Sequence, residues 1–427
     1  MVTGSGGFIG SIVARAISAA GHHVVYAQRK PSRYIGGECF EFVSCDFTKD
    51  LESDAWIPRL LDIDAVVNCV GILRARRKND FERIHVTATR ALFDACVAAG
   101  VARIIQISAL GDPEDSSFIA SKHAGDRYLT TLDTDWVVLR PSVVYTPHGS
   151  YGGTSLLRAM AALPLALAVP GDGTQQIQPL SAEDLAEIVV ATLQSDTASR
   201  KLLEVVGPEV LSLREYLLAF RRWLQLPDPL VLRVPLALVG AVSWVGEWMG
   251  SGSVGLTMYR MLQRGNVGSA NAFQLLAEST GCRPRRLDAV LMEVPSFVQD
   301  RWHARLYFVR PFLRLSIAFV WIVSGLIGLL HPLADAERIV TELGVPAVAT
   351  PWLVYGASVV NLGLGFSLLV ARFVALVGLL MCISLLAYTL VLGIGIPSLW
   401  IEPFGGLLKN IVLFPAVLAL LAMGDPR

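Results

Sequence analysis

The chain has 427 residues, too many for one ordinary domain, and its 36 Lys and Arg residues balance 36 Asp and Glu residues, so no overall positive field recruits nucleic acid. Hydrophobic residues make up 53% of the sequence and the mean hydropathy is +0.52, which is too apolar for a purely soluble protein. The six cysteines show no CxxC spacing, so we expect neither a metal site nor a disulfide framework, and a reducing compartment fits.

The first predicted element is a glycine-rich turn between a strand and a helix. Gly4, Gly7 and Gly10 recur at three-residue spacing, a helix-compatible run follows over 12–20, and a second strand is predicted over 24–26. In such a turn the first glycine permits the bend, the second lets backbone approach a pyrophosphate, and the third lets the helix pack close. The helix N-terminus also offers N–H groups to phosphates. The pattern therefore predicts a dinucleotide-binding βαβ unit.

The strand before this turn is unusually short. Only Met1, Val2 and Thr3 precede Gly4, whereas a central strand usually has about five or six residues. Two interpretations stay open, a genuinely short strand or a natural start a few codons upstream of Met1. We favour the upstream start, because half a central strand would leave ladder groups of its neighbours unpaired.

Strands and helices alternate in the residues that follow. The pattern predicts strands over 65–70, 103–108 and 136–141, and helices over 81–99 and 121–130. This alternation predicts an α/β fold with a doubly wound parallel sheet. Ligands of such sheets bind at the carboxyl ends of the strands, and the residues expected there are Gly4, Arg29, Asp46, Gly71 and Ser108.

Taken together, these motifs resemble the extended or atypical branch of the short-chain dehydrogenase/reductase superfamily. Residues 3–10 match its TGxxGFxG turn, 45–47 resemble its adenine-contacting aspartate motif, and 68–71 lie where the family has an NxxG loop over the cofactor. The nearest subgroup contains NAD-dependent epimerases and dehydratases and the nucleotide-binding accessory subunit of respiratory complex I. The resemblance implies a Rossmann fold, and it assigns cofactor binding to Gly4, Ser5, Gly7, Phe8, Ile9, Asp46, Phe47, Val70, Gly71 and Lys122.

The end of the second strand indicates which cofactor is preferred. NAD-binding relatives place a carboxylate there to accept a hydrogen bond from the ribose 2′-OH. Here Arg29 and Lys30 follow Gln28, and no carboxylate appears before Glu38. Two cations suit a 2′-phosphate, which arginine can bind through two hydrogen bonds. We therefore expect NADP(H) ahead of NAD, although a solvated basic turn would look similar.

The catalytic motif departs from the family pattern. Members use a Tyr-x-x-x-Lys pair on one helix, with tyrosine as acid/base and lysine lowering its pKa and binding the nicotinamide ribose. Lys122 matches the lysine and Ser108 the helper serine, but Phe118 stands where the tyrosine belongs. Ser117, Ser121 or a water would have to replace the phenol. A bound nucleotide with little turnover is therefore at least as well supported as an active reductase.

Three further stretches attract attention. His85 occupies the asparagine position of the family's N-V-x-G-T helix motif and has no metal-ligand company. The basic run 74–78 follows Gly71 and would suit an anionic substrate or lipid head groups, although such runs are more often solvated surface. The apolar, tryptophan-rich stretch 229–249 is too short for a span, and it either lies at an interface or packs.

The C-terminal third predicts four membrane-spanning helices. The apolar runs 312–330, 352–371, 373–396 and 404–423 are each close to the ~20 residues that cross a bilayer. Lipid offers backbone no hydrogen-bond partners, so helices are the natural solution. Tryptophans near the span ends suit interfacial anchoring.

Charge predicts the orientation of these spans. Arginines cluster before the first span and Arg372 lies on the same side, whereas the 331–351 loop is acidic. In membrane proteins the loops rich in Lys and Arg face the cytoplasm. We therefore expect both termini and the nucleotide domain on the cytoplasmic side of a bacterial-type cell membrane. The arginines before the first span are Arg301, Arg305, Arg310 and Arg314.

This region resembles the DoxX-like membrane domain found behind such dehydrogenase domains. Residues 321–325 look like its W-x-x-S-G motif, and 403–410 match its P-x-G-x-x-x-K-N motif. Lys409 and Asn410 at the start of a span would be costly unless paired or snorkelling to the interface. The resemblance implies two domains, a nucleotide-binding domain over 1–300 and a DoxX-like four-helix domain over 301–427.

Three functional classes remain open. The first is a membrane-anchored NADP(H)-dependent oxidoreductase with a lipophilic substrate such as a quinone or isoprenoid-like molecule. The second is a nucleotide-binding structural or sensing subunit of a membrane complex, and Phe118 would be its signature. The third is an epimerase or dehydratase, which would also need the missing tyrosine. The fusion to membrane helices favours a membrane-resident substrate or partner in each case.

Overall fold

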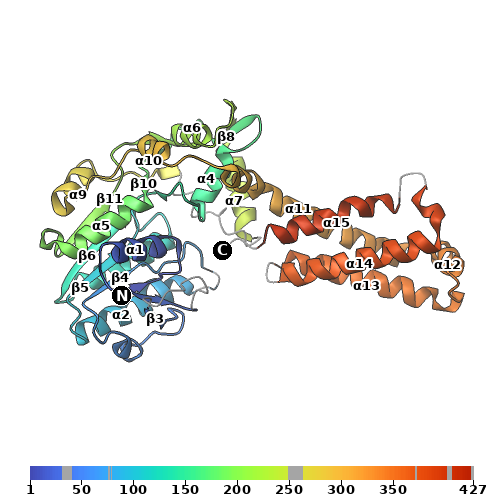
Figure 1. Cartoon of the computed structure of the whole chain (residues 1–427), viewed down its shortest axis with the longest axis horizontal. Helices are drawn as coiled ribbons and strands as arrows, with labels where there is room; N and C mark the ends of the chain where they lie inside the picture. Colours follow the sequence, from blue (N-terminus) through green and yellow to red (C-terminus); the bar gives the residue numbers. More distant parts are fainter. Residues whose placement is uncertain are drawn as a thin grey trace. The chain divides into compact units, whose positions relative to one another are not determined.

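The computed structural model describes residues 1–30, 41–75, 77, 79–248, 263–370, 373–401 and 406–424. The chain divides into two compact units, Met1–Ala304 (unit 1) and Arg305–Arg427 (unit 2). Unit 1 contains a sheet with flanking helices, and unit 2 is helical (Figure 1).

Unit 1 is built on a seven-stranded sheet in which every described pair of neighbours is parallel. The strand order is β11-β6-β5-β4-β1-β2-β3, so the order reverses between β1 and β4, where open α/β sheets bind ligands. This topology confirms the predicted doubly wound α/β fold. The strands are β1 (Val2–Thr3), β2 (Val25–Gln28), β3 (Glu41–Ser44), β4 (Ala65–Asn68), β5 (Arg103–Ile107), β6 (Asp135–Pro141) and β11 (Lys201–Val205).

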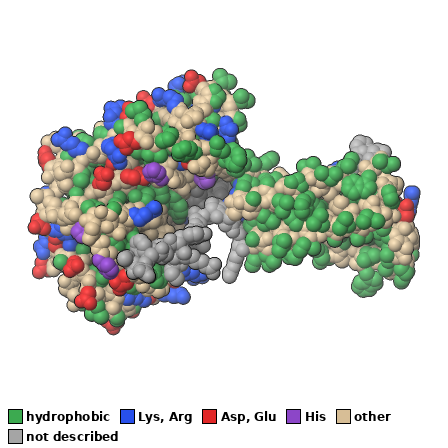
Figure 2. Space-filling model, in the orientation of Figure 1, with side chains coloured by type: hydrophobic (Ala, Val, Ile, Leu, Met, Phe, Trp, Pro, Cys, Tyr) green, Lys and Arg blue, Asp and Glu red, His purple; other side chains and the backbone are tan. Residues whose placement is uncertain are grey.

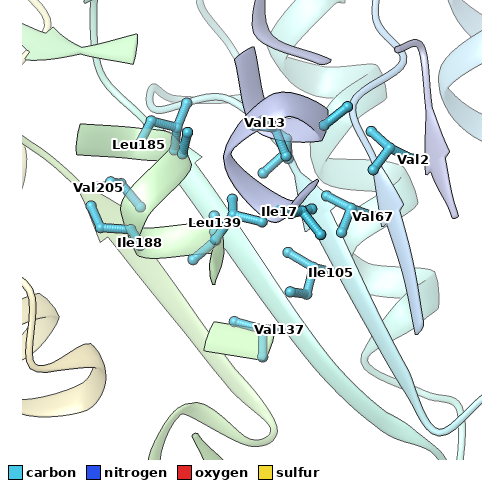
Figure 3. Close-up of a cluster of buried hydrophobic side chains, with 14 of the residues drawn as sticks. Val2, Val13, Ile17, Val67, Ile105, Val137, Leu139, Leu185, Ile188 and Val205 are labelled. Atoms are coloured by element: carbon cyan, nitrogen blue, oxygen red, sulfur yellow. The ribbon is translucent and has the colours of Figure 1, made fainter. Parts of the chain in front are cut away.

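Apolar side chains cover both faces of this sheet. On one face, Val67 and Ile105 pack with Val13 and Ile17 of α1 (Phe8–Ala19), and α5 (Ala182–Gln194) extends the same cluster through Leu185 and Ile188 (Figure 3). On the other face, α2 (Ala88–Ala98) covers the strands with a separate cluster. Strands buried on both faces read as continuous apolar runs, and this explains why the sequence pattern located them.

The short first strand lies in the middle of the sheet. Val2 and Thr3 pair with β2 on one side and with β4 on the other. Met1 extends the pairing, because the N–H of Val67 donates to its carbonyl oxygen at 2.9 Å. An upstream start stays a prediction.

Two predicted helices differ in detail from the structure. The run 81–99 forms a π-helical turn over Glu82–Thr87 followed by α2, so the helix widens where His85 lies. The helix predicted over 121–130 begins earlier, as α3 (Ser117–Leu129), because the hydroxyl of Ser116 caps it by accepting the N–H of Ile119. Phe118 and Lys122 therefore share one helix.

A second group of elements packs beside the carboxyl end of β6. It contains α4 (Gly153–Ala161), α6 (Leu213–Trp223), α10 (Leu287–Glu293) and the paired strands β8 (Ala166–Pro170) and β13 (Leu230–Val234) around one apolar cluster. Smaller pairs are β7 (Val144–Tyr145) with β10 (Leu180–Ser181) and β9 (Gln176–Ile177) with β12 (Leu211–Ser212), and α9 (Ala272–Thr280) packs by β11. The predicted Ser212–Glu215 capping box is present at α6. The stretch 229–249 contributes β13 and α7 (Leu236–Trp248), and its last residue, Met249, lies outside the described residues.

Within the part of the chain that the structure describes, three helices are long and apolar enough to cross a membrane. They are α11 (Val298–Leu330), which begins in unit 1, a helical stretch over Ala347–Leu369 that includes α13 (Thr350–Leu369), and α14 (Val374–Gly395). Hydrophobic side chains cover their visible surface (Figure 2). The fourth predicted span appears as α15 (Leu408–Ala422), 15 residues long.

The polar residues of unit 2 are partly accounted for. The amide of Asn410 on α15 donates to the hydroxyl of Thr389 on α14 at 2.9 Å, which pairs one of the two residues predicted to be costly in lipid. Lys409 is exposed. The predicted 331–351 loop contains a short helix, α12 (Leu333–Glu342). Arg372 and residues 403–405 of the P-x-G motif lie outside the described residues.

Candidate functional site

The predicted glycine turn joins β1 to α1 at the carboxyl edge of the sheet. Gly4 has φ +69°, a left-handed conformation that other residues adopt at a cost. A Cβ atom at Gly10 would lie 2.2 Å from the carbonyl oxygen of Gly4, so a side chain there would push α1 away. α1 starts at Phe8 with Gly7 as its N-cap and no side-chain cap. This cradle fits the pyrophosphate of a dinucleotide.

The loop after β4 lies against this turn. A Cβ atom at Gly4 would meet Val70 Cγ2 at 3.1 Å. Asn68 fixes the loop: it accepts the hydroxyl of Thr3 at 2.7 Å and the N–H of Val70 at 3.2 Å, and its amide donates to Gln106 at 2.8 Å. One buried side chain thus ties the ends of β1, β4 and β5 together.

Lys122 reaches this loop from α3. Its ammonium donates to the carbonyl oxygen of Val70 at 3.1 Å, and a Cβ atom at Gly71 would lie 3.7 Å from its Nζ. The side chain is buried, and burial lowers the pKa of Lys122 to about 8 against the opposing attraction of Asp126. The structure therefore brings together Val70, Gly71 and Lys122, as the resemblance implied.

His85 closes the same loop from the π-helical turn. Its Nε2 accepts the N–H of Ile72 at 2.9 Å, so Nδ1 carries the proton and donates to the hydroxyl of Ser121 at 2.8 Å. That hydroxyl donates in turn to the carbonyl oxygen of Phe118 at 2.8 Å. Burial, followed by the charge of Lys122, lowers the pKa of His85 to about 2, and the imidazole stays neutral.

Phe118 stands at the position of the family's tyrosine, and its ring makes aromatic contacts there. Its ring meets the imidazole of His85 edge-on at 5.7 Å between centroids, and Phe81 lies 6.4 Å from it. These three rings form an apolar wall beside Lys122. The ring of Phe118 offers no proton to a substrate.

Ser108 lies at the end of β5, but its hydroxyl is engaged. It donates to Oδ2 of Asp126 at 2.7 Å, and Arg140 holds the same oxygen at 3.0 Å. Asp126 is almost fully buried and lies one helical turn after Lys122. Ser108 therefore belongs to an ion-pair network under the site.

The predicted adenosine side is also assembled from strand ends. Arg29 and Lys30 are exposed directly after β2. Asp46, after β3, accepts the N–H and the hydroxyl of Thr48 at 3.0 Å and 2.7 Å. Burial opposes its ionisation, but these hydrogen bonds and the charge of Arg29 outweigh it and lower the pKa of Asp46.

Of the remaining predicted residues, Ser5 and Phe8 lie at the turn, whereas Phe47 lies in the core. Ser5 is buried and donates to the carbonyl oxygen of Ala27 at 3.4 Å. Phe47 packs edge-on against Trp56 in the core. Phe8 stacks on Tyr151 at 6.0 Å between centroids, so the loop before α4 reaches the glycine turn.

Sequence reasoning missed two of the residues that build this site. His85 looks isolated in the sequence, although its place in the family's asparagine motif is a usable signal. Asp126 carries a signal as well, because it lies four residues after Lys122 and so shares its helix face. Among the residues that the structure describes, no group of three or more His, Cys, Asp or Glu side chains could hold a metal ion.

Comparison with family models divides the chain in two. The NAD dependent epimerase/dehydratase family matches residues 1–205, and the DoxX-like family matches residues 318–419.

Three curated proteins are similar to the N-terminal part. An epimerase family protein of Mycobacterium bovis is 30% identical over 259 residues, covering 54% of this chain and 80% of the relative. A ceramide reductase of Caulobacter vibrioides is 28% identical and covers 57% and 77%. NADH dehydrogenase [ubiquinone] 1 alpha subcomplex subunit 9 of Mus musculus is 27% identical and covers 44% and 48%.

Solved structures share the fold. The structure of gox2253 has a TM-score of 0.54 at 19% identity, and it covers 71% of this chain and 98% of that one. MoeE5 in complex with UDP-glucose and NAD gives 0.50 at 20% identity with the same coverage. On the matched family model, the Mycobacterium bovis relative and the shared fold, the chain belongs to the NAD dependent epimerase/dehydratase family and carries a DoxX-like region behind it.

Proposed function

We propose that this protein is a membrane-anchored oxidoreductase that binds NADP(H) at the carboxyl edge of the unit 1 sheet and acts on a membrane-soluble substrate. One observation carries the proposal: Lys122 donates to the carbonyl oxygen of Val70 beside Gly71, and the same loop packs on the glycine turn. A nucleotide-binding cradle and the family's lysine thus meet in one place.

The chain's own residues would hold the cofactor from several sides. The turn at Gly4, Gly7 and Gly10 and the start of α1 would bind the pyrophosphate. Asp46 would contact the adenosine, and Lys122 would bind the nicotinamide ribose.

Arg29 and Lys30 support NADP(H) over NAD. Both are exposed at the end of β2, where a carboxylate would serve a free 2′-OH. The electrostatic effect of Arg29 on Asp46 indicates that the guanidinium lies near the adenosine side. A 2′-phosphate would bring two negative charges to these cations.

Bound NADPH would supply a hydride to a carbonyl carbon, so a proton must reach the carbonyl oxygen. Phe118 cannot provide it, and Ser108 and Ser121 donate to other protein groups. The Lys122 ammonium has three N–H groups and a pKa of about 8, so it can release a proton near neutral pH. We assign the proton transfer to Lys122, which solvent would then reprotonate.

Two observations support a lipophilic substrate. The DoxX-like helices would anchor the chain in the bilayer, and a relative with 77% coverage is named a ceramide reductase. A membrane lipid with a ketone, or a quinone or isoprenoid-like molecule, fits both. The half-buried rings of Phe81 and Phe118, which pack against the buried imidazole of His85, would offer such a molecule an apolar contact.

Phe118 favours a second candidate function. A protein that lost its acid/base would hold the nucleotide without consuming it and act as a structural or sensing subunit of a membrane complex. The similarity to a subunit of NADH dehydrogenase supports this candidate. An epimerase or dehydratase reaction is less well supported, because it would also need the phenol that Phe118 lacks.

A titration followed by a turnover assay tests the proposal. The full chain in lipid nanodiscs is titrated with NADPH and NADH by nicotinamide fluorescence. Loss of reduced nicotinamide is then followed with extracted membrane lipids as substrates. Tight NADPH binding with lipid-dependent oxidation supports the oxidoreductase. Binding without oxidation by any lipid fraction favours the second candidate, and no nucleotide binding refutes both.

We also propose a cytoplasmic unit 1 in a multi-pass protein. The arginines at the start of α11 and the acidic α12 support this orientation. Reporters fused within unit 1 and after Arg427 should be cytoplasmic, and a tag at 335–345 should be reachable from outside. A cytoplasmic tag at 335–345 contradicts the four-span arrangement.

A further inference from the structure

Unit 1 exposes large apolar side chains along one edge. We call these six residues the apolar edge: Leu165, Leu230, Leu232, Leu238, Phe297 and Trp302. Leu165 is 84% exposed, Leu230 72% and Trp302 64%. Scattered exposed leucines need no explanation, but large exposed apolar side chains that gather on neighbouring segments mark an interaction site. In Figure 2, hydrophobic side chains mixed with basic ones cover the part of unit 1 around β8.

Hydrogen bonds show that the two chain segments of this edge meet. Leu230 donates its N–H to the carbonyl oxygen of Leu165 at 3.0 Å. The last turn of α6 contacts the segment 294–302, which holds Phe297 and Trp302. Trp223 Nε1 donates to the carbonyl oxygen of Val294 at 2.6 Å, and Ser296 donates to that of Trp223. Arg221 in the same turn donates to the carbonyl oxygen of Leu163 at 2.8 Å, so the segment that holds Leu165 lies beside α6 as well.

The alternation of side chains along β13 shows that the exposed leucines are not poorly packed residues of the core. β13 alternates, with Val231 packed against the cluster around Leu167 and with Leu230 and Leu232 facing outward. A strand with apolar side chains on both faces is normally covered on both. Here the second face carries leucines that lie exposed.

We infer that the apolar edge of unit 1 inserts into the surface of the lipid bilayer. The start of α11 supplies the first argument. Ala304 is buried in the unit 1 core, so the first turns of this helix are fixed to the unit. One turn after Trp302 the helix becomes apolar, and from 306 to 330 its only charged residues are Arg310 and Arg314. Trp302 thus directly precedes a stretch suited to lipid.

Charge supplies the second argument. Arg222 and Arg233 are exposed at the two ends of the 222–233 segment, which holds a single acidic residue, Asp228. Arg301 lies beside this segment and donates to Gln225 at 3.4 Å. Apolar side chains with arginines beside them fit the boundary between acyl chains and anionic headgroups. A protein partner would not require this proximity to the start of a membrane helix.

The inference rests on the membrane anchoring proposed above and adds an access route. A site whose domain is embedded at the leaflet surface can receive a lipid without releasing it to water. The stretch 229–249, for which sequence left an interface and simple packing open, then belongs to an interface in its exposed part.

Photo-crosslinking in the full chain tests this surface. The photo-reactive residue p-benzoylphenylalanine replaces Leu165, Leu230 or Trp302, one position at a time, in nanodiscs of phosphatidylcholine and phosphatidylglycerol. Leu61, which is 70% exposed elsewhere in unit 1, is the matched control, and Leu379 on α14 is the positive control for the membrane. Lipid adducts are identified by mass spectrometry.

We expect several times more lipid adduct at the three edge positions than at Leu61. Arg222→Glu combined with Arg233→Glu should reduce the adducts with phosphatidylglycerol. Adducts at Leu379 but only control levels at the edge would overturn the inference while leaving the membrane anchoring intact. Cross-links between two copies in place of lipid adducts would also overturn it, because the edge would then be a dimer face. Control levels at Leu379 as well would refute the proposed anchoring.

Discussion

His85 Nε2 accepts a hydrogen bond from the backbone N–H of Ile72 at 2.9 Å, and His85 Nδ1 contacts Ser121 on α3. His85 thus joins the loop 70–72 to the helix that carries Lys122. The imidazole spans the gap because Nδ1 reaches Ser121 on α3 at the same time. An asparagine, the family's residue at this position, is shorter. His85 therefore acts as a positioning residue for the loop 70–72.

Replacing His85 should loosen that loop. His85→Ala leaves the partly buried N–H of Ile72 without its acceptor, which costs up to ~1–3 kcal/mol locally. Hydrogen–deuterium exchange of the peptide containing Ile72 should accelerate markedly, and affinity for NADPH should fall. His85→Asn should retain part of the protection. Unchanged exchange in His85→Ala would show that the loop is held by other contacts.

Lys122 should limit stability while it supports binding. Burial lowers its pKa from 10.5 to about 8, so the folded protein bears a cost of roughly 3 kcal/mol for keeping the ammonium at neutral pH. Between those two pKa values the unfolded chain binds more protons than the folded one, so stability rises with pH in that window. Lys122→Met should therefore raise the melting temperature at pH 7 and remove this rise.

The same substitution should weaken NADPH binding, because the ammonium is lost. In the native protein binding should fall as pH rises through about 8, where Lys122 loses its proton, and in Lys122→Met it should be flat there. Thermal melts with and without NADPH measure both effects. A variant that is less stable, with unchanged affinity, would contradict this role.

Sequence located most of the framework and part of the site. The glycine turn, Val70 and Gly71 were predictable because family motifs fix them after strand ends, and Lys122 because the family motif fixes it on a helix. The acceptor of Ser108 was not predictable, because Asp126 and Arg140 meet only after β6 pairs beside β5. The contact between His85 and Ile72 needs the π-helical turn, and no periodicity announces such a turn.

Arg29 should decide between the two nicotinamide cofactors. If its guanidinium meets a 2′-phosphate, Arg29→Asp should cost NADPH ~1.5–3 kcal/mol of binding free energy and affect NADH much less. Arg283→Asp is the matched control: this arginine is exposed and follows α9, which packs by β11 at the far edge of the sheet from β3. Fluorescence titrations compare the affinities of wild type and of both variants for NADPH and for NADH. Equal losses for both nucleotides in Arg29→Asp would refute the preference for NADP(H).

Phe118→Tyr should separate an enzyme from a binding protein. The residue lies one helical turn before Lys122, and its ring already packs against His85, so a phenol fits at the edge of the same aromatic wall. The Lys122 ammonium would lower the pKa of the new hydroxyl, and acid–base help of this kind is worth roughly 10²–10⁴-fold in rate. If Lys122 alone transfers the proton in the native protein, wild type turns over slowly, Phe118→Tyr is faster, and Lys122→Met is inactive in either background. Phe118→Leu provides the control for packing and should leave the slow rate in place.

If wild type holds NADPH without consuming it and only Phe118→Tyr reduces a carbonyl, the native chain is a nucleotide-binding subunit that lost its acid/base. Robust turnover that survives Lys122→Met would exclude the lysine as the proton donor.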